Sequence, residues 1–357
     1  MRRSQPRQGH AAVCAALLLS APLLALPAAA EPSDGVPFAI AADYRDGERY
    51  MGIRLRGALR LRPRVVAGIT PHGLSGLAWD ADDQLLYAVS DLGYLVHLRP
   101  QLADGTLVGV NIVAVYPLRD AAGAALQTPD QDAEEICARK TRNGIGGDAE
   151  LLIAFEHGPR IARYSPQGTY LGEIAPPAAL ARAADYADPN QQLEALALTR
   201  RFGLISGPER PLRGAPAGQL ALYADQGRRW TFTPFDPDYS GLVGLATLPD
   251  DNLLILERRF ISLAQPLVIV LRRMILPDVF AAPSVTTEVA RLDTSRGWAI
   301  DNFEAVAWHQ GAGYFLISDD NASALQTTVL LYIELLAADQ RGPEADWRPP
   351  PLANHHL

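Results

Sequence analysis

NFEAVAWHQGAGYFLISDDN, residues 302–321, is the clearest copy of a pattern that recurs along this sequence and indicates its fold. Glu304 directly precedes a first apolar run. After a glycine-containing turn, a second apolar run leads to Asp319. A similar arrangement of an acidic or small residue, an aliphatic run and a second apolar run that ends in an acid occurs five times. The equivalent positions of the five copies are Ser75, Glu134, Glu194, Val243 and Glu304, which lie 59, 60, 49 and 61 residues apart. Repeats of this length predict a circular array of similar units.

Each repeat contains short β-type runs separated by turn residues. The runs of the first repeat are residues 75–79, 85–90, 94–98 and 108–118. Four strands per repeat is the composition of a β-propeller blade. The rival fold, a β-sandwich, also has many short strands but does not produce equivalent acids at near-constant spacing. We therefore predict an all-β protein, a β-propeller of four-stranded blades. Before the third repeat, the Pro- and Ala-rich residues 176–188 could form a short surface helix.

The two ends of the chain are expected to close the ring. The fifth repeat has only three obvious strands, the last at residues 329–333. Residues 50–61 have an extended pattern and can supply the fourth strand, and pairing of the N- and C-terminal strands leaves no free sheet edge. We count five blades. A sixth, assembled from residues 36–66 and irregular segments, is the alternative count.

The first thirty residues have the pattern of an export signal. Three arginines precede an apolar run at residues 11–26. We predict a secretory signal peptide over residues 1–30, cleaved after Ala30, and hence a secreted or periplasmic protein. The Arg2-Arg3 pair leaves twin-arginine export open as the alternative to ordinary secretion.

The predicted mature chain is acidic. Removal of residues 1–30 deletes three arginines and no acids, so 29 basic residues stand against 40 acidic ones and nucleic-acid binding is not expected. No other apolar stretch approaches the ~20 residues that a membrane helix needs. Cys137 is the only remaining cysteine, so no intramolecular disulfide is expected. We expect a monomer whose propeller domain spans residues 31–342, followed by a Pro-rich tail at 343–357.

Strand direction predicts where the repeated acids lie. Within a repeat, the first marked position opens the first strand and the second ends the second strand. Since these strands are antiparallel, the two positions lie at the same rim. The pairs expected to meet are Glu304 with Asp319, Glu194 with Glu209, and Glu134 with Glu156. Because the first strands line the axis, these pairs should converge on the mouth of the central channel.

So many carboxylates in one channel mouth indicate a bound cation. Ca²⁺ takes about six to eight oxygen ligands, and without a cation the carboxylates raise one another's pKa and destabilise the fold. The candidate metal ligands are Asp91, Glu134, Glu156, Glu194, Glu209, Glu257, Glu304, Asp319 and Asp320. The alternative is that these acids pair with arginines or only accept hydrogen bonds from backbone donors at turns.

Basic residues lie next to the same rim. They are His157, Arg160, Arg210, Arg258 and Arg259. The planar fork of Arg matches the oxygens of a phosphate ester, so we expect Arg258 and its neighbours to orient one; the alternative for each Arg is an ordinary ion pair. The sequence has no Gly-x-Ser-x-Gly elbow, no His-Glu-x-x-His motif and no Walker loop, which argues against those three catalytic types.

The sequence, with its five repeats and recurring acids, resembles the "esterase-like activity of phytase" family, a secreted phytase-like β-propeller domain. The matching segments are residues 302–307, 316–321 and 326–331, supported by 74–78, 90–93, 132–134, 155–161, 193–197 and 256–260. The resemblance implies a calcium-dependent phosphoric-ester hydrolase in which metal-activated water attacks a phosphate ester at the acidic mouth. Glu304, Asp319 and Arg258 are the catalytic candidates under that mechanism. The single lysine, Lys140, argues against phytate itself.

Two other functions stay open from the sequence. The rim could be a cation- or ligand-binding socket without turnover. It could also hold one axial metal ion, as lactonase-like propellers do, with Asn302, Asn321 and Glu304 as ligands. In every case the expected partner is a small molecule, and for the hydrolase it is a phosphorylated ester.

Overall fold

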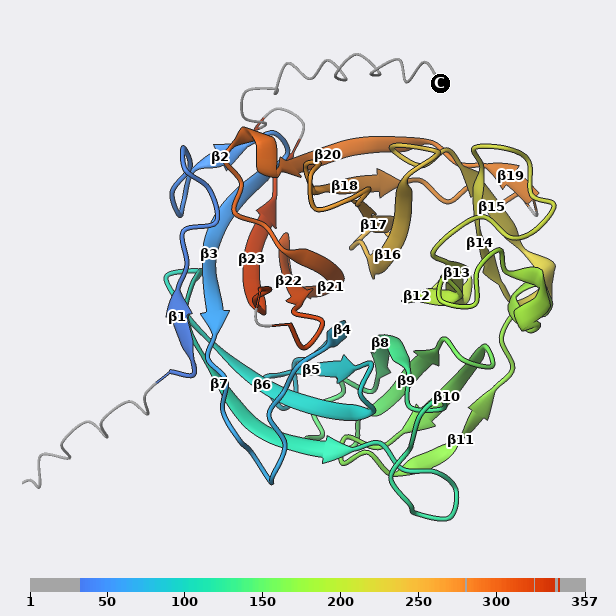
Figure 1. Ribbon diagram of the computed structural model, residues 1–357, viewed down its shortest axis with the longest axis horizontal. Helices are drawn as coiled ribbons and strands as arrows, with labels where there is room; N and C mark the ends of the chain where they lie inside the picture. Colours follow the sequence, from blue (N-terminus) through green and yellow to red (C-terminus); the bar gives the residue numbers. More distant parts are fainter. Residues whose placement is uncertain (1–32, 280, 324, 338–339, 341–357) are drawn as a thin grey trace, which may run out of the picture. The chain divides into compact units, whose positions relative to one another are not determined.

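The computed structural model describes residues 33–340 except 280, 324, 338 and 339. Over these residues the protein is all-β, with no α-helix and four short 3-10 turns. Figure 1 shows five sheets arranged in a ring around a central axis, which confirms the predicted propeller and the count of five blades. The predicted signal peptide and the Pro-rich tail lie outside the described residues. No helix in the described part of the chain has the length and hydrophobicity to cross a membrane.

Each blade has four antiparallel strands, which follow one another from the axis outward. Blade 1 comprises β4 (Leu74–Asp80), β5 (Leu85–Ser90), β6 (Tyr94–Ala103) and β7 (Thr106–Pro117). Blade 2 comprises β8 (Ala133–Arg139), β9 (Glu150–Phe155), β10 (Arg160–Tyr164) and β11 (Tyr170–Ile174). Blade 3 comprises β12 (Leu193–Thr199), β13 (Gly203–Pro208), β14 (Leu220–Ala224) and β15 (Arg229–Phe232). Blade 4 comprises β16 (Ser240–Thr247), β17 (Leu253–Arg259), β18 (Val268–Met274) and β20 (Thr286–Asp293).

Blade 5 combines the two ends of the described chain. It comprises β21 (Asn302–Gln310), β22 (Gly313–Asp319), β23 (Val329–Leu335) and β3 (Ile53–Leu61). β3 pairs antiparallel with β23, from Val329 opposite Arg60 to Leu335 opposite Ile53. This pairing confirms the predicted closure of the ring by the N-terminal strand, and it covers the edge that β23 would otherwise leave free.

Short additional elements decorate the blades. The strands β1 (Gly35–Pro37) and β2 (Arg49–Tyr50) pair with β3, and β19 (Ala281–Pro283) pairs in parallel with β15. The Pro- and Ala-rich segment before blade 3, where the sequence suggested a surface helix, forms two 3-10 turns. The 3-10 turns of the described chain are η1 (Ala178–Leu180), η2 (Ala183–Asp185), η3 (Asp225–Gly227) and η4 (Thr294–Arg296).

The hydrophobic core is divided among the interfaces between neighbouring blades. Five buried apolar clusters are found in the described chain, one at each interface. Between blades 5 and 1, for example, Leu86, Phe315 and Leu330 are fully buried. A strand in the middle of a blade has neighbours on both faces, so β5 and β22 are buried at every position. This is why their sequences are continuous apolar runs and do not alternate between apolar and polar residues.

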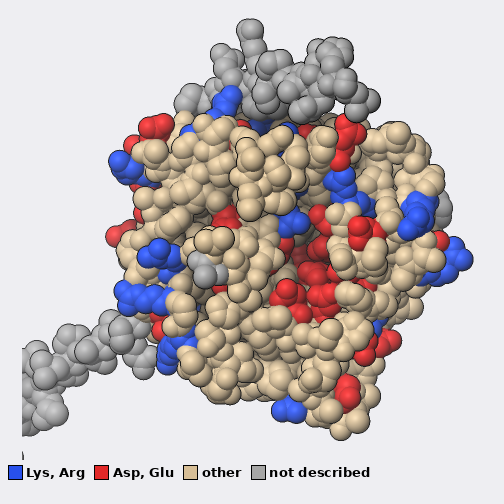
Figure 2. All heavy atoms as spheres, viewed as in Figure 1, with Lys and Arg blue, Asp and Glu red and all other residues tan. Residues whose placement is uncertain are grey.

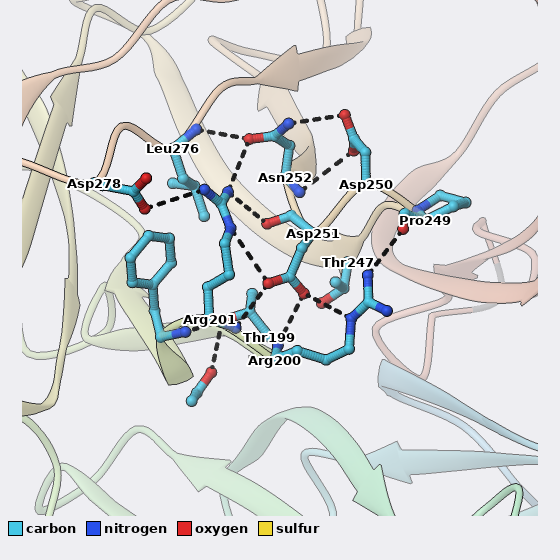
Figure 3. A network of polar contacts seen from close by, with 12 residues as sticks. Thr199, Arg200, Arg201, Thr247, Pro249, Asp250, Asp251, Asn252, Leu276 and Asp278 are labelled. Carbon is cyan, nitrogen blue, oxygen red and sulfur yellow. Dashed lines mark hydrogen bonds and ion pairs between the residues drawn. The ribbon is translucent and has the colours of Figure 1, made fainter.

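A polar network joins the turns of blades 3 and 4 (Figure 3). Asp251, in the β16–β17 turn, is buried and accepts hydrogen bonds from the backbone N–H groups of Arg200 at 2.8 Å and Arg201 at 2.7 Å, in the β12–β13 turn. The Arg201 side chain donates in return to the Asp251 carbonyl at 3.2 Å and to Asn252 Oδ1 at 3.3 Å. Since Arg200 and Arg201 belong to blade 3 and Asp251 to blade 4, these bonds fix the β12–β13 turn against the β16–β17 turn.

We expect Asp251→Ala to lower the free energy of unfolding by about 1–3 kcal/mol, because it leaves two partly buried N–H groups without an acceptor. Urea unfolding followed by circular dichroism measures the change. Asp43→Ala, at an exposed acid, is the matched control and should stay within about 0.5 kcal/mol of the parent. Equal stability of the two variants would contradict a role for this network.

Candidate functional site

The innermost strand of every blade has a β-bulge near its start. The strand register shifts by one residue in β4, β8, β12, β16 and β21. The residues left out of the pairing are Ser75, Glu134, Glu194, Val243 and Glu304. A bulge leaves one residue unpaired and redirects its side chain. The five equivalent positions of the sequence repeat are thus the five bulges, and three of them present a glutamate.

The second strands bring their acids to the same rim. The pairing registers place Ala133 opposite Phe155, which precedes Glu156, and place Asn302 opposite Asp319. Electrostatic repulsion links the acids that the sequence expected to meet: Glu134 with Glu156, Glu194 with Glu209, and Glu304 with Asp319. Figure 2 shows acidic side chains gathered in a hollow at the centre of the ring. The acids therefore share one channel mouth.

The environment of the mouth favours protonated carboxyl groups on the side of blades 1 and 2. Burial raises the pKa of Asp91 to about 7, and repulsion from Asp319 and Asp132 adds to the effect. Burial likewise raises the pKa of Glu156 to about 7, although the N–H of Gln192 donates to this carboxylate at 3.0 Å and lowers it. Each of these carboxylates is therefore more stable in the folded protein when a proton or a cation neutralises it.

The glutamates at the bulges show the same behaviour. Burial raises the pKa of Glu134 well above its usual range, and repulsion from Glu194 is the next cause. Burial also raises the pKa of Glu194 well above its usual range. For Glu304, burial raises the pKa to about 8 although Arg258 lowers it, and for Asp319 burial raises the pKa to about 6. The mouth thus holds more carboxyl groups than the protein can keep ionised without an additional positive charge.

Arg258 compensates the acids on the side of blades 3 and 5. Its Nη1 donates to Asn302 Oδ1 at 2.5 Å and to Glu304 Oε1, and its Nη2 donates to Glu209 Oε1 at 3.3 Å. The Asn302 amide also donates to Glu304 Oε1 at 2.8 Å. Although burial lowers the pKa of Arg258, the carboxylates of Glu304, Glu209 and Glu194 outweigh it and raise the pKa, so the guanidinium stays charged. Half of the mouth therefore carries its own counter-charge.

The other half contains a group suited to holding a metal ion. One ligand atom from each of Asp132, Glu156 and His157 lies within 4.8 Å of the others. His157 Nδ1 is 2.6 Å from Asp132 Oδ2, and Glu156 is buried while the other two are partly exposed. Sequence reasoning places His157 among the rim bases and misses Asp132. The available signal is the Asp132-x-Glu134 spacing, which puts two acids two residues apart at the start of β8.

Two of the nine candidate metal ligands are engaged elsewhere. Glu257 is buried, and it accepts hydrogen bonds from Arg272 Nη1 at 2.7 Å and from the N–H of Phe235 at 2.5 Å. Asp320 accepts hydrogen bonds from the N–H of Gly73 at 3.1 Å and from Thr328 Oγ1 at 3.0 Å, and His72 Nδ1 lies 2.9 Å from its Oδ2. Both carboxylates hold neighbouring segments of the propeller together.

The other basic residues of the rim also have protein partners. Arg259 Nε donates to Asp236 Oδ2 at 2.8 Å. Arg210 Nη1 donates to the carbonyl of Ser240 at 2.6 Å, and Arg160 Nη1 donates to the carbonyl of His157 at 2.9 Å. These arginines position the loops around the mouth.

Glu135 is the one large side chain among the residues that directly follow the five bulges. The residues that follow the five bulges are Gly76, Glu135, Ala195, Gly244 and Ala305. Glu135 is 1% exposed, and its Oε1 accepts a hydrogen bond from the N–H of Ile136 at 2.9 Å. A Cβ atom at Gly76 would lie 2.8 Å from the Cα of Glu135, so the backbones of β4 and β8 approach closely only because residue 76 is glycine. Four small residues therefore make room for one large one beside the mouth.

The ring of five blades and the acidic mouth define this protein as a five-bladed β-propeller with an axial acidic site. A family model described as "Phytase-like: Esterase-like activity of phytase" matches residues 69–322, and the chain belongs to this family. A search of curated protein sequences finds no match.

Several solved structures resemble the fold. A gluconolactonase from Xanthomonas campestris, XC5397, is 12% identical with a TM-score of 0.42, over 85% of this chain and 99% of that one. The β-propeller domain of Cps50 (Swd1) from Myceliophteria thermophila is 11% identical with a TM-score of 0.37, over 84% and 98% of the two chains. U3-55K is 10% identical with a TM-score of 0.41, over 75% and 97%. Likeness at these levels concerns the propeller architecture and carries no argument about activity.

Proposed function

We propose that this protein is a cation-dependent hydrolase that cleaves phosphate esters at the acidic channel mouth. The observation that carries the proposal is the group formed by Asp132, Glu156 and His157, which lies in the half of the mouth that Arg258 does not reach. Membership of the phytase-like family, whose description refers to esterase-like activity, supports an ester as the substrate.

The donor set fits a hard divalent cation. Asp132 and Glu156 supply carboxylate oxygens. Burial and repulsion from Asp132 raise the pKa of the neighbouring Asp91 and Glu134, which makes them further acceptors of positive charge. Oxygen donors of this kind suit Ca²⁺. His157 is a nitrogen donor and is typical of transition-metal sites, but its Nδ1 lies against Asp132, so the imidazole can orient that carboxylate. We therefore propose Ca²⁺ as the bound ion.

The side chains around the group have separate tasks in this proposal. When bound, Ca²⁺ supplies a concentrated positive charge that polarises phosphoryl oxygens. Asp132 and Glu156 hold the cation, and His157 keeps Asp132 in position. Arg258 compensates the charge of Glu304 and Glu209 on the opposite side of the mouth, so that these carboxylates repel an incoming phosphate ester less.

A second candidate function is cation or ligand binding without turnover. Arg160, Arg210 and Arg259 all donate hydrogen bonds to protein oxygens. A phosphate ester would therefore find fewer arginine donors at the rim than the sequence suggested, which favours binding without turnover. A lactonase-like reaction would place a metal ion among Asn302, Asn321 and Glu304. In the structure Asn302 and Glu304 hold Arg258, so this alternative requires Arg258 to move.

One experiment separates these functions. The purified protein is analysed for metal content and tested on phosphomonoesters, phosphodiesters, carboxyl esters and a sugar lactone, with and without a chelator. We expect hydrolysis of a phosphate ester that the chelator abolishes and Ca²⁺ restores. Activity that survives exhaustive chelation would contradict the mechanism, lactone hydrolysis alone would favour the lactonase-like reaction, and bound Ca²⁺ without any hydrolysis would favour the binding function.

We also propose that the protein acts outside the cytoplasm as a monomer on a small-molecule ester. The signal-like residues 1–30 support export, and the acidic balance of the chain supports a partner other than nucleic acid. Fractionation of producing cells, with sizing of the purified chain, tests both statements.

A further inference from the structure

The half of the mouth that contains Arg258 has the form of an occupied cation pocket. Three oxygens converge on its guanidinium: Asn302 Oδ1, Glu304 Oε1 and Glu209 Oε1. They come from blades 3 and 5, whereas Arg258 belongs to β17 of blade 4. Carboxylate and amide oxygens are also the ligands that hard divalent cations take in proteins. A positive group is therefore bound where three blades meet.

The pocket is built into the fold and is shielded from solvent. The side chains of Arg258, Glu209 and Glu304 are 20%, 9% and 17% exposed. Gly241, opposite Arg258 in the pairing of β16 with β17, makes room for the Glu209 carboxylate, because a Cβ atom there would lie 2.4 Å from Glu209 Oε1. The Asn302 amide donates to Glu304 Oε1 and fixes that carboxylate as well. Contacts other than those with the guanidinium therefore also help to hold these oxygens in place.

We propose that Arg258 is the built-in occupant of a second cation pocket, formed by Glu209, Asn302 and Glu304, and that its removal opens this pocket to a divalent cation. In the native protein the tethered guanidinium cannot dissociate, so only the half with Asp132, Glu156 and His157 exchanges an ion with solvent. The count of one exchangeable ion rests on the proposed function. The existence of the second pocket does not.

Arg258→Met tests the proposal, because methionine removes the charge and keeps an unbranched side chain. Each protein is stripped with chelator and dialysed against Ca²⁺, and bound calcium is measured per chain. We expect one ion for the parent and two for Arg258→Met. Arg259→Met is the matched control, since Arg259 pairs with Asp236, and it should bind one ion. Arg258→Met combined with Glu304→Gln should return the count to one, because the new pocket loses a ligand.

The outcomes distinguish the two proposals. An Arg258→Met variant that folds and binds no more calcium than the parent overturns the second pocket. A parent that binds none and an Arg258→Met variant that binds one would overturn the proposed function and support the pocket. If Arg258→Met folds only in the presence of Ca²⁺, the ion has replaced the guanidinium, as proposed. If it folds neither with nor without Ca²⁺, the guanidinium has a role that an ion cannot take, and the proposal fails.

Discussion

Combining Asp132→Asn with Glu156→Gln is expected to abolish Ca²⁺ binding and phosphate-ester hydrolysis, and at the same time to stabilise the metal-free protein. The loss follows because the two carboxylates that would hold the ion become neutral. The gain follows because Glu156 is a buried carboxyl whose pKa is raised by burial to about 7, so its ionised form is unfavourable in the folded state. Glutamine keeps an oxygen to accept the Gln192 N–H. Sites that bind or act on ligands commonly reduce stability in this way.

The expected size of the gain is about 2 kcal/mol near pH 8 in the presence of chelator. Urea unfolding measures it, and calcium analysis with the ester assay measures the loss. Glu257→Gln is the matched control, because Glu257 is also an acid of the sequence repeat but holds Arg272 at 2.7 Å. Breaking that buried ion pair should cost about 3 kcal/mol and leave calcium binding intact. A destabilised double variant that still binds calcium would refute the assignment of the metal group.

The second large effect expected is a pH-dependent stability that Ca²⁺ reverses. Burial raises the folded-state pKa of Glu156 and of Asp91 to about 7 and that of Asp319 to about 6, whereas unfolded carboxyls titrate near about 4. Between about pH 4 and about pH 7 the folded protein therefore binds more protons than the unfolded chain. The stability that these groups contribute is fully present below about pH 4 and is lost progressively as the pH rises through about 6 to 7.

Calcium should restore this stability where the carboxyls are ionised. At a free concentration about 100 times Kd, a bound ion adds about 2.7 kcal/mol, which corresponds to roughly 4 °C in Tm for a chain of this size. Calorimetry at about pH 5 and about pH 8, with chelator or with Ca²⁺, measures the shift. We expect a large shift at the higher pH and a small one at the lower pH, where protons compete. Mg²⁺, which demands octahedral geometry, serves as the comparison ion. Equal shifts at both pH values would show that the mouth carboxyls are not the ligands.

Two arginines that are adjacent in the sequence, Arg258 and Arg259, have different partners in the structure. The sequence grouped Arg258 and Arg259 as neighbours that could orient a phosphate ester. In the structure Arg258 lies among the mouth carboxylates, and Arg259, one residue later on the strand, pairs with Asp236. Successive side chains of a strand point to opposite faces, so two adjacent arginines meet different partners.

The fold followed from local information. The spacing of Ser75, Glu134, Glu194, Val243 and Glu304 indicated five like units, short apolar runs indicated four strands in each, and the deficit in the last unit indicated closure by residues near β3. These inferences succeed because hydrogen bonding within blades 1 to 4 joins strands that are close in sequence, and only the outer strand of blade 5 comes from the other end of the described chain. Antiparallel pairing of consecutive strands also placed the acids at one rim without knowledge of any contact between blades.

The number of units, their closure into a ring and the gathering of acids at one mouth can be read from the order of residues along the chain. Which of these acids has a positive partner depends on the packing of one blade against another. Glu257 and Glu156 occupy equivalent repeat positions, yet Arg272 neutralises one and a neighbouring His and Asp surround the other. Likewise Arg258 reaches Glu209 and Glu304 on other blades. The physical reason is that charge compensation depends on distances of a few ångströms between long side chains from different blades, and no local sequence pattern specifies those distances.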